Sequence, residues 1–489
     1  RFLSDPATSQ GARTNVGQLT DIVAANPNLR LSLTLSPLAI EEWARASDGY
    51  ETSGPEGLRT FSKESPGAVA SRHALDRVKE LLGSGRADLL DTPYAEPDLA
   101  GLVSIGGLSD LVGQWALTDS VTRSALGSEV ASGAAFLGDQ LPAGALPELE
   151  RRGNTFVVLA SASVRSGTAT ASPGIYTLSD SGIRALVYDS RPVRAAAENN
   201  TDVFYDALFE RARSTQPSEP LVLRFEIGPG TRDSIASFER ALGWLSDVPW
   251  VDIIATREAA AYPNPGEAGL VPTLAPRGAP AGYWSEVADA RTKAIAARDA
   301  FGSADADARS AMSGVYVAES LCWAGPDMSY ALVDRGRAFA ASASRYVDDI
   351  FASVTIGARD VTLSNRTGEV PVSVVNGTGK PMMLDLVTSA SRVTVESRVK
   401  RVSLDAGENV LTIPVDMGSV ISDTLSIRLV SADLTIKEAT VQVHASYLDR
   451  LATLGMVFLV LVGLLLFIRR RVRAAGAGTM PEEPIETGE

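Results

Sequence analysis

The stretch EPLVLRFEIGPGT (219–231) places one acidic residue, Glu226, where an apolar, strand-forming run ends and a Gly-Pro-Gly turn begins. Acidic side chains at strand ends that face a loop are where barrel and open-sheet enzymes place their chemistry. Glu226 is flanked by Phe225 and Ile227, so one acid stands where polar neighbours are expected. It is the first candidate for a catalytic carboxylate, or for the remnant of one.

A second carboxylate is needed before Glu226 could cleave a glycosidic bond with retention, because that reaction uses a nucleophile and an acid about 5 Å apart. The candidates are acids at expected strand ends or near the PYAEPD motif (93–98), namely Asp91, Glu96, Asp98, Asp139 and Asp189. Asp91 and Asp189 stand at strand ends on the face expected for Glu226, so they are the preferred partners. The alternative is that both accept hydrogen bonds from helix-capping or turn amides.

A binding role is the other possibility for these positions. Tyr94, Glu96 and Asp98, together with Glu226, are the candidate ligand-binding residues. Trp250, which follows a proline in VPWVDIIATREAA, is expected to be a packing anchor beneath the barrel and not a sugar platform.

Metal and nucleic-acid chemistry are disfavoured by residue usage. His73 and His444 are the two histidines, they lie in different predicted domains, and Cys322 is the one cysteine. A zinc site usually needs three convergent protein ligands, so we expect no metal and no cofactor. The net charge of −14 is spread along the chain, whereas a nucleic-acid surface requires clustered Lys and Arg.

One segment is typical of a membrane helix. Leu451 to Ile468 is an uncharged run of 18 residues, about 27 Å of helix, and four arginines follow it within five positions. We expect a single-pass protein of the cell membrane, with the N-terminal body outside the cytoplasm; a buried core helix is the alternative. Export needs a signal that the first residues lack, so we expect that signal to be cleaved or to lie outside this sequence.

The pattern of elements predicts a multidomain α/β and β protein with a membrane anchor. Strands that alternate with helices predict βα units, Ala-rich stretches with a three-to-four period predict helices, and period-two alternation predicts a β-sandwich with a hairpin at Asn376-Gly377. The expected boundaries are a βα barrel at 1–262, a Pro/Gly linker at 263–282, a helical region at 283–355, an Ig-like β-sandwich at 356–446, a transmembrane helix at 449–469 and a cytoplasmic tail at 470–489.

The order of segments carries a resemblance. TPYAEPDLAGL, LPAGALPELERRGNTFVVLASAS and the segment that closes in VPWVDIIATREAA follow one another in the first half. This order resembles an actinobacterial membrane-anchored family of unknown function with a PYADPD-like element, a β-sandwich and a C-terminal membrane helix. The resemblance covers nearly the whole chain. It implies a cell-envelope setting and a polytopic membrane partner, such as a lipid II flippase or another envelope transporter.

The α/β half is more remotely similar to the barrels of family 57 glycoside hydrolases and polysaccharide deacetylases. The segments EPLVLRFEIGPGT, SIASFERALGWL and VDIIATREAA stand in the matching order. The resemblance implies a seven-stranded (β/α)7-type barrel. In the deacetylases an Asp and two His hold a metal, and this chain has no such histidine pair.

Two functions remain open. The first is an extracytoplasmic binding or scaffold protein with a catalytically degenerate barrel, which contacts a glycan, a lipid-linked precursor or a membrane partner; this is the hypothesis we favour. The second is a membrane-anchored glycoside hydrolase that acts on envelope polysaccharide with Glu226 and either Asp91 or Asp189. A salt bridge to Glu226 favours the first, and an open pair of carboxylates favours the second.

Overall fold

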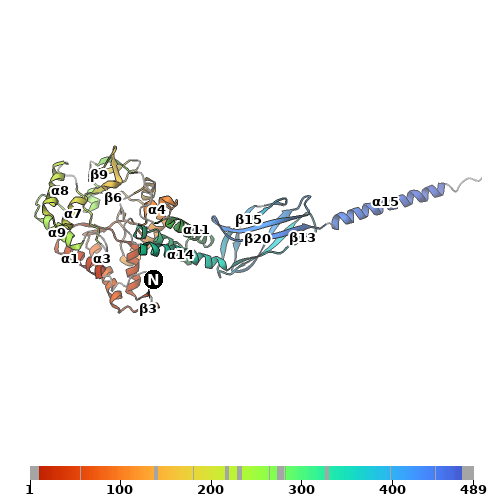
Figure 1. Ribbon diagram of the computed structural model, residues 1–489, viewed down its shortest axis with the longest axis horizontal. Coiled ribbons are helices and arrows are strands. Elements are labelled where there is room, and N and C mark those ends of the chain that lie inside the picture. The colour runs from red at the N-terminus through yellow and green to blue at the C-terminus, as the bar shows by residue number, and fades with distance from the viewer. Residues whose placement is uncertain are drawn as a thin grey trace, which may run out of the picture. The chain divides into compact units, whose positions relative to one another are not determined.

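The structure is a computed structural model in which the chain divides into two compact units (Figure 1). The first comprises Arg1–Arg291 and Met312–Ala343, and the second comprises Thr292–Ala311 and Ser344–Glu489. The residues that the structure describes are 10–54, 57–136, 141–179, 181–214, 220–227, 234–263, 265–271, 280, 282–324, 330–396, 398–446 and 448–475.

Short parallel strands form the centre of the first unit. In chain order they are β1 (Leu31–Leu33), β4 (Ala87–Leu89), β5 (Gly133–Ala135), β6 (Phe156–Ala160) and β10 (Arg184–Tyr188). β1 pairs with β4, while β5, β6 and β10 pair in that order, and a bridge between Asp91 and Ala134 joins the two groups. β6 is buried along nearly its whole length, as expected for a parallel strand covered on both faces.

Two extended segments, 220–227 and 251–255, continue this arrangement without regular strand pairing. The Asp189 N–H donates to the Val222 carbonyl (3.0 Å), which places the first segment beside the end of β10. Ile253 of the second segment packs in the same hydrophobic core as the leucines of β1. Seven extended segments therefore follow one another in chain order, and the last returns to the first.

Further strands extend the sheet on the far side of β10. The order β5-β6-β10-β9-β11-β7-β8 adds β9 (Gly174–Leu178), β11 (Gly266–Leu270), β7 (Val164–Ser166) and β8 (Ala169–Thr170). β11 lies within 263–282, the stretch expected to be a linker, and pairs in parallel with β9 and antiparallel with β7. A separate hairpin joins β2 (Tyr50–Gly54) and β3 (Gly57–Phe61).

Helices pack against these strands. Those wholly in the first unit are α1 (Gln10–Ala25), α2 (Pro37–Ser47), α3 (Pro66–Gly83), α4 (Leu99–Ser104), α5 (Asp110–Val121), α6 (Leu146–Arg152), α7 (Ser190–Ala197), α8 (Thr201–Ser214), α9 (Ile235–Ser246), α10 (Thr256–Ala260) and α13 (Leu321–Ala324). A π-helical turn, Thr122–Leu126, continues α5. Trp115 of α5 and Leu149 of α6 are buried against the outward side chains of β6 and β10.

Three longer helices contribute residues to both units. They are α11 (Tyr283–Phe301), α12 (Ala306–Ala318) and α14 (Tyr330–Ala352). Within the second unit, Phe301 of α11 stacks on Phe351 of α14 with ring centroids 6.1 Å apart.

The second unit contains a β-sandwich. One sheet has the order β12-β14-β18-β16 and the other β13-β20-β19-β15-β17. The strands are β12 (Val354–Gly357), β13 (Val361–Leu363), β14 (Thr367–Asn376), β15 (Met382–Ala390), β16 (Thr394–Val395), β17 (Val399–Leu404), β18 (Gly407–Asp416), β19 (Ser422–Ser431) and β20 (Leu434–Ala445). Buried side chains alternate along β14 and β19, so the period-two pattern of the sequence corresponds to the inner faces of two sheets.

Asn376-Gly377 does not form the expected hairpin. β14 pairs with β12 and β18, while β15 pairs with β17 and β19 in the other sheet. The reason is visible at Asn376, which is 1% exposed and whose Nδ2 donates to the carbonyls of Lys380, Leu404 and Asp405 (2.9–3.2 Å). The side chain holds a crossing between sheets where the dipeptide alone predicts a two-residue turn.

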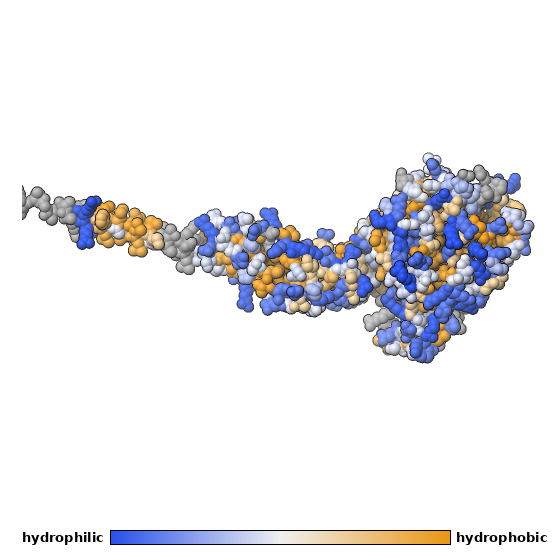
Figure 2. Space-filling view, turned by 180° about the vertical axis from the view of Figure 1, so that it is seen from behind, coloured by the Kyte–Doolittle hydropathy of each residue, from blue (hydrophilic) through white to orange (hydrophobic). Residues whose placement is uncertain are grey.

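The expected transmembrane helix at 449–469 and the single-pass membrane localisation are wrong. Among the described residues, no helix combines the length and the apolar character that crossing a bilayer requires. The helix that contains this stretch is α15 (Leu448–Ala475). Large apolar side chains between Met456 and Ile468 are exposed (Figure 2).

Candidate functional site

The carboxyl ends of several barrel segments meet around Arg224. Its guanidinium forms an ion pair with the Glu226 carboxylate (2.9 Å) and donates to the Phe136 carbonyl just after β5 (3.0 Å). It also lies over the ring of Tyr188, the last residue of β10, 5.4 Å from the ring centre. The Arg224 side chain is 15% exposed and that of Glu226 is 44% exposed.

Glu96 of the PYAEPD motif faces the same place. Burial raises its pKa to about 7; the Arg224 guanidinium opposes the rise and the Glu226 carboxylate adds to it. The backbone of Glu96 is in the left-handed region (φ 50°), which is unusual for a residue with a side chain and marks a position held by its surroundings. We call Glu96, Tyr188, Arg224 and Glu226 the barrel-end cluster.

The cluster brings together two acids with different environments. Glu96 is 7% exposed, so desolvation favours its neutral form, whereas Glu226 is more exposed and accepts from the guanidinium beside it. One group can therefore donate a proton near neutral pH while the other accepts hydrogen bonds. Together with the guanidinium, these groups match the hydroxyls of a sugar.

The other residues of the PYAEPD motif hold the loop itself. The Tyr94 hydroxyl donates to the Glu41 carboxylate of α2, and burial raises the pKa of Tyr94. The Asp98 side chain caps the N-terminus of α4 by accepting from Ala100 N–H (3.1 Å). Both side chains are at least nine-tenths buried.

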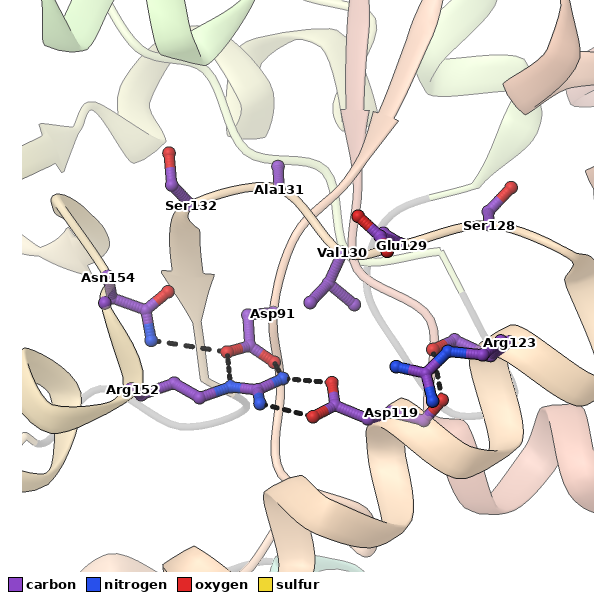
Figure 3. Close-up of a pocket in the computed structure, with 12 residues that line it drawn as sticks. Asp91, Asp119, Arg123, Ser128, Glu129, Val130, Ala131, Ser132, Arg152 and Asn154 are labelled. Carbon is purple, nitrogen blue, oxygen red and sulfur yellow. Dashed lines mark hydrogen bonds and ion pairs between the residues drawn. The ribbon is translucent and has the colours of Figure 1, made fainter.

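Asp91 lies in a different place, two residues after the end of β4. Its carboxylate accepts from Arg152 Nε (2.8 Å) and from Asn154 Nδ2 (3.3 Å), and the same guanidinium pairs with Asp119 of α5. Figure 3 shows Arg152 held between the two carboxylates. Burial raises the pKa of Asp91, while Arg152 opposes this rise.

A pocket of about 270 Å³ opens beside this pair (Figure 3). Its wall is made by the loop before β5, the turn before β6 and the π-helical turn after α5, and the residues are Asp91, Asp119, Thr122, Arg123, Ser128, Glu129, Val130, Ala131, Ser132, Arg152, Gly153 and Asn154. Glu226 does not line it.

Asp189 caps a helix. Its carboxylate accepts from Arg191 N–H (2.9 Å) at the start of α7 and pairs with the Arg191 guanidinium (3.0 Å). It is 3% exposed, so its position corresponds to the capping alternative. Asp139, the remaining candidate, lies outside the described residues.

The structure therefore brings Glu96 to Glu226, and gives Asp91 and Asp189 arginine partners of their own. Sequence reasoning missed Arg224, although a signal was present: residues two apart on an extended segment share a face, and Arg224 stands two before Glu226. Arg152 had no such signal, because it is 61 positions from Asp91.

Metal ligands and the exposed Trp250 are two further features of the first unit. Within the described part of the chain, no group of three or more His, Cys, Asp or Glu side chains is placed to hold a metal ion. Trp250, expected to be a packing anchor, is 52% exposed and contacts the ring of Phe209 on α8, which is exposed to the same degree.

The sequence matches no protein-family model and no curated protein. Among solved structures, the chain resembles the α-amylase AmyC of Thermotoga maritima, with a TM-score of 0.53 and 10% identity over 72% of this chain and 90% of the amylase. The chain shares its fold with this amylase. At this identity the likeness concerns the fold alone.

Two further solved structures are similar but have TM-scores below 0.5. A family 57 branching enzyme of Thermococcus kodakaraensis has a TM-score of 0.48 at 9% identity, over 70% of this chain and 84% of the enzyme. The 4-α-glucanotransferase of Thermococcus litoralis has a TM-score of 0.49 at 11% identity, over 86% of this chain and 81% of the transferase. The remote resemblance to a glycoside hydrolase is supported at the level of fold by the amylase, and the resemblance to an actinobacterial family stays a prediction.

Proposed function

We propose that the barrel binds a glycan at the barrel-end cluster and no longer cleaves it. The observation that carries this proposal is the 2.9 Å ion pair between Arg224 and Glu226. A nucleophilic carboxylate must be free to attack the sugar, and a guanidinium that donates to it has to be displaced first. The same pair offers donors and acceptors to sugar hydroxyls, while the ring of Tyr188 adds an apolar surface.

The partner in this proposal is a glycan, while the polytopic membrane partner that the resemblance implies stays a prediction. The similar solved structures are enzymes named for α-glucans or their transfer, so a malto-oligosaccharide is the first ligand to try. A β-linked oligosaccharide of equal length tests whether the linkage matters.

Isothermal titration calorimetry of the full chain with maltoheptaose tests the proposal. We expect binding by the wild type and at least a tenfold weaker affinity for Arg224→Met and Glu226→Gln, with no release of new reducing ends. Arg151→Met and Glu148→Gln are matched controls, since that arginine–glutamate pair lies on the surface of α6. Equal affinity in all five proteins would overturn the proposal.

A specific observation supports a second function, glycoside hydrolysis. An acid and a nucleophile require two carboxyl groups in one site, and Glu96, whose pKa is raised to about 7, lies close to Glu226. In this alternative Glu96 replaces Asp91 and Asp189 as the partner of Glu226. Turnover of maltoheptaose by the wild type, abolished in both Glu96→Gln and Glu226→Gln and falling above a pH of about 7, would establish it.

A further inference from the structure

The segment after α12 pairs with the PYAEPD loop although more than two hundred positions separate them. The Asp98 N–H donates to the Glu319 carbonyl (2.8 Å), and the Leu321 N–H donates to the Glu96 carbonyl (2.9 Å). A bridge between Pro97 and Ser320 lies between these two bonds. The backbone conformation of Glu96 is therefore fixed by residues that follow α12.

Glu319 also contacts this region through its side chain, which is fully buried. Gln114 of α5 is the connecting residue: its Oε1 accepts from the Ala95 N–H (3.1 Å), and its Nε2 faces Glu319 Oε2 (2.9 Å). A backbone N–H can only donate, so the Gln114 amide is oriented with its oxygen toward Ala95. Nε2 then donates to Glu319 Oε2, which must be an acceptor.

The other oxygen of this carboxyl group has no hydrogen-bond partner within the described part of the chain when Glu319 is a carboxylate. The Glu319 side chain lies within hydrogen-bond range of Asp110, which is another acceptor. Both Asp110 oxygens already accept from the Arg291 guanidinium (2.6 and 2.9 Å), so Asp110 is the acceptor in its contact with Glu319. A proton on Glu319 Oε1 supplies the missing donor and removes the contact between two negative charges.

We propose that Glu319 is a neutral carboxylic acid that donates from Oε1 to Asp110, and that it is a positioning residue for Glu96. The hydrogen bonds run from Arg291 through Asp110, Glu319 and Gln114 to the Ala95 N–H, next to Glu96. Burial raises the pKa of Glu319 well above its usual range and Asp110 raises it further, while Gln114 and Arg291 oppose the rise.

A neutral carboxylic acid at Glu319 avoids an unpaired charge in the protein interior. An unpaired charge in the same position would require a dedicated cation, and Arg291, which acts on Glu319 electrostatically, already pairs with Asp110. Only the role of Glu96 as part of a ligand site rests on the proposed function; the protonation of Glu319 and its hold on the loop do not.

Glu319→Gln is the decisive variant, because a glutamine amide can donate to Asp110 while its oxygen accepts from Gln114. The protonated carboxyl stretch in the infrared spectrum of the full chain at neutral pH is the direct readout. We expect the wild-type minus Glu319→Gln difference spectrum to show this band, and its absence would overturn the proposal.

The positioning role has a separate readout. In each Glu319 background, the melting temperature is measured against pH for the protein with Glu96 and for the protein with Glu96→Gln. The difference between the two melting temperatures changes as Glu96 titrates, so it reports that titration without any ligand. We expect the pH midpoint of the Glu96 titration to stay near 7 in the Glu319→Gln background and to move toward 4.5 in the Glu319→Ala background. The positioning role would be contradicted if the pH midpoint of Glu96 were unchanged in Glu319→Ala. It would also be contradicted if Glu319→Gln and Glu319→Ala shifted that midpoint equally.

These readouts need no glycan, so failure of glycan binding and failure of this inference are distinguishable. If Glu319→Ala does not fold, the infrared comparison and the titration of Glu96 in Glu319→Gln still test the proposal. A pH midpoint of Glu96 that moves away from 7 in Glu319→Gln contradicts the proposal. A midpoint that stays near 7, together with the carboxyl band, supports it.

Discussion

Glu96 shows how one buried acid makes the stability of the whole barrel depend on pH. The fold raises its pKa from 4.5 to about 7, which means that the native state favours the neutral form. Below a pH of 4.5 the group is protonated in both the folded and the unfolded chain, so it does not lower the free energy of unfolding. As the pH rises from 4.5 to 7, the unfolded chain loses the proton first and the folded state is progressively destabilised.

The Glu96→Gln variant removes this dependence. We expect equal stability of the two proteins near pH 4 and a more stable variant above pH 7, by about 3 kcal/mol for a rise of this size. Urea unfolding at a series of pH values measures the difference. A difference that does not vary with pH would show that Glu96 titrates normally.

Arg152 illustrates the opposite case, a charge whose removal leaves a buried partner. Asp91 is 1% exposed in its side chain, and Arg152 is the cation that holds it. We expect Arg152→Met to destabilise the protein by about 3–5 kcal/mol at neutral pH. The loss of stability should be smaller at acidic pH, where Asp91 becomes protonated. It should also be smaller in the double variant Asp91→Asn/Arg152→Met, because that protein has no carboxylate at position 91.

The neighbouring Arg151 provides the control in chemical denaturation, because its side chain is 62% exposed and its partner Glu148, unlike Asp91, still reaches solvent. An equal loss of stability in Arg151→Met and Arg152→Met would contradict this account.

Among the elements, α7 depends on a cap that the sequence allowed as an alternative to catalysis. Asp189 is buried, and its carboxylate accepts from the first turn of the helix. We expect Asp189→Ala to lower the free energy of unfolding by about 1–2 kcal/mol, and Asp189→Asn to recover most of it because Asn also caps well. If turnover on a glycan exists and both variants retain it, Asp189 is excluded from catalysis.

The elements also show what sequence patterns can and cannot predict. β6 and β10 were predictable because runs such as FVVL and RALVY are apolar on both faces. β11 was not, because Gly266–Leu270 contains two glycines inside a Pro/Gly-rich stretch and becomes a strand only by pairing with β9 and β7. The partner sheet of β15 likewise depends on tertiary hydrogen bonds of Asn376.

The candidate site divides in the same way. Glu226 at a strand end and PYAEPD as a special loop were both readable from residue order, and the structure places Glu96 beside Glu226. The pairing of Glu96 with Leu321, and the carboxyl group of Glu319, could not be predicted, because they depend on contacts across more than two hundred positions.

At the scale of the whole molecule, the second unit has an internal connection of its own. Lys380, between β14 and β15, forms ion pairs with Asp305 (2.6 Å) and Asp307 (2.7 Å) at the start of α12 and lies over the Phe301 ring. We expect Lys380→Met to destabilise this unit by about 1 kcal/mol, and the effect to shrink at high salt.

Hydrogen exchange of the sandwich strands measures this effect separately from the barrel. Lys293→Met is the matched control, since Lys293 is equally exposed but forms one ion pair, with Asp348. Faster exchange confined to the first unit in Lys380→Met would contradict the prediction.

The crossing at Asn376 has a consequence for producing the protein in a eukaryotic secretory host. Asn376-Gly377-Thr378 is an acceptor sequence for N-linked glycosylation, and the atom that would carry the sugar is Nδ2. Oligosaccharide added there during synthesis would occupy the interior of the sandwich, where that nitrogen makes three hydrogen bonds. Modified chains would fail to close the two sheets and would be retained by quality control, so a bacterial host is the better source.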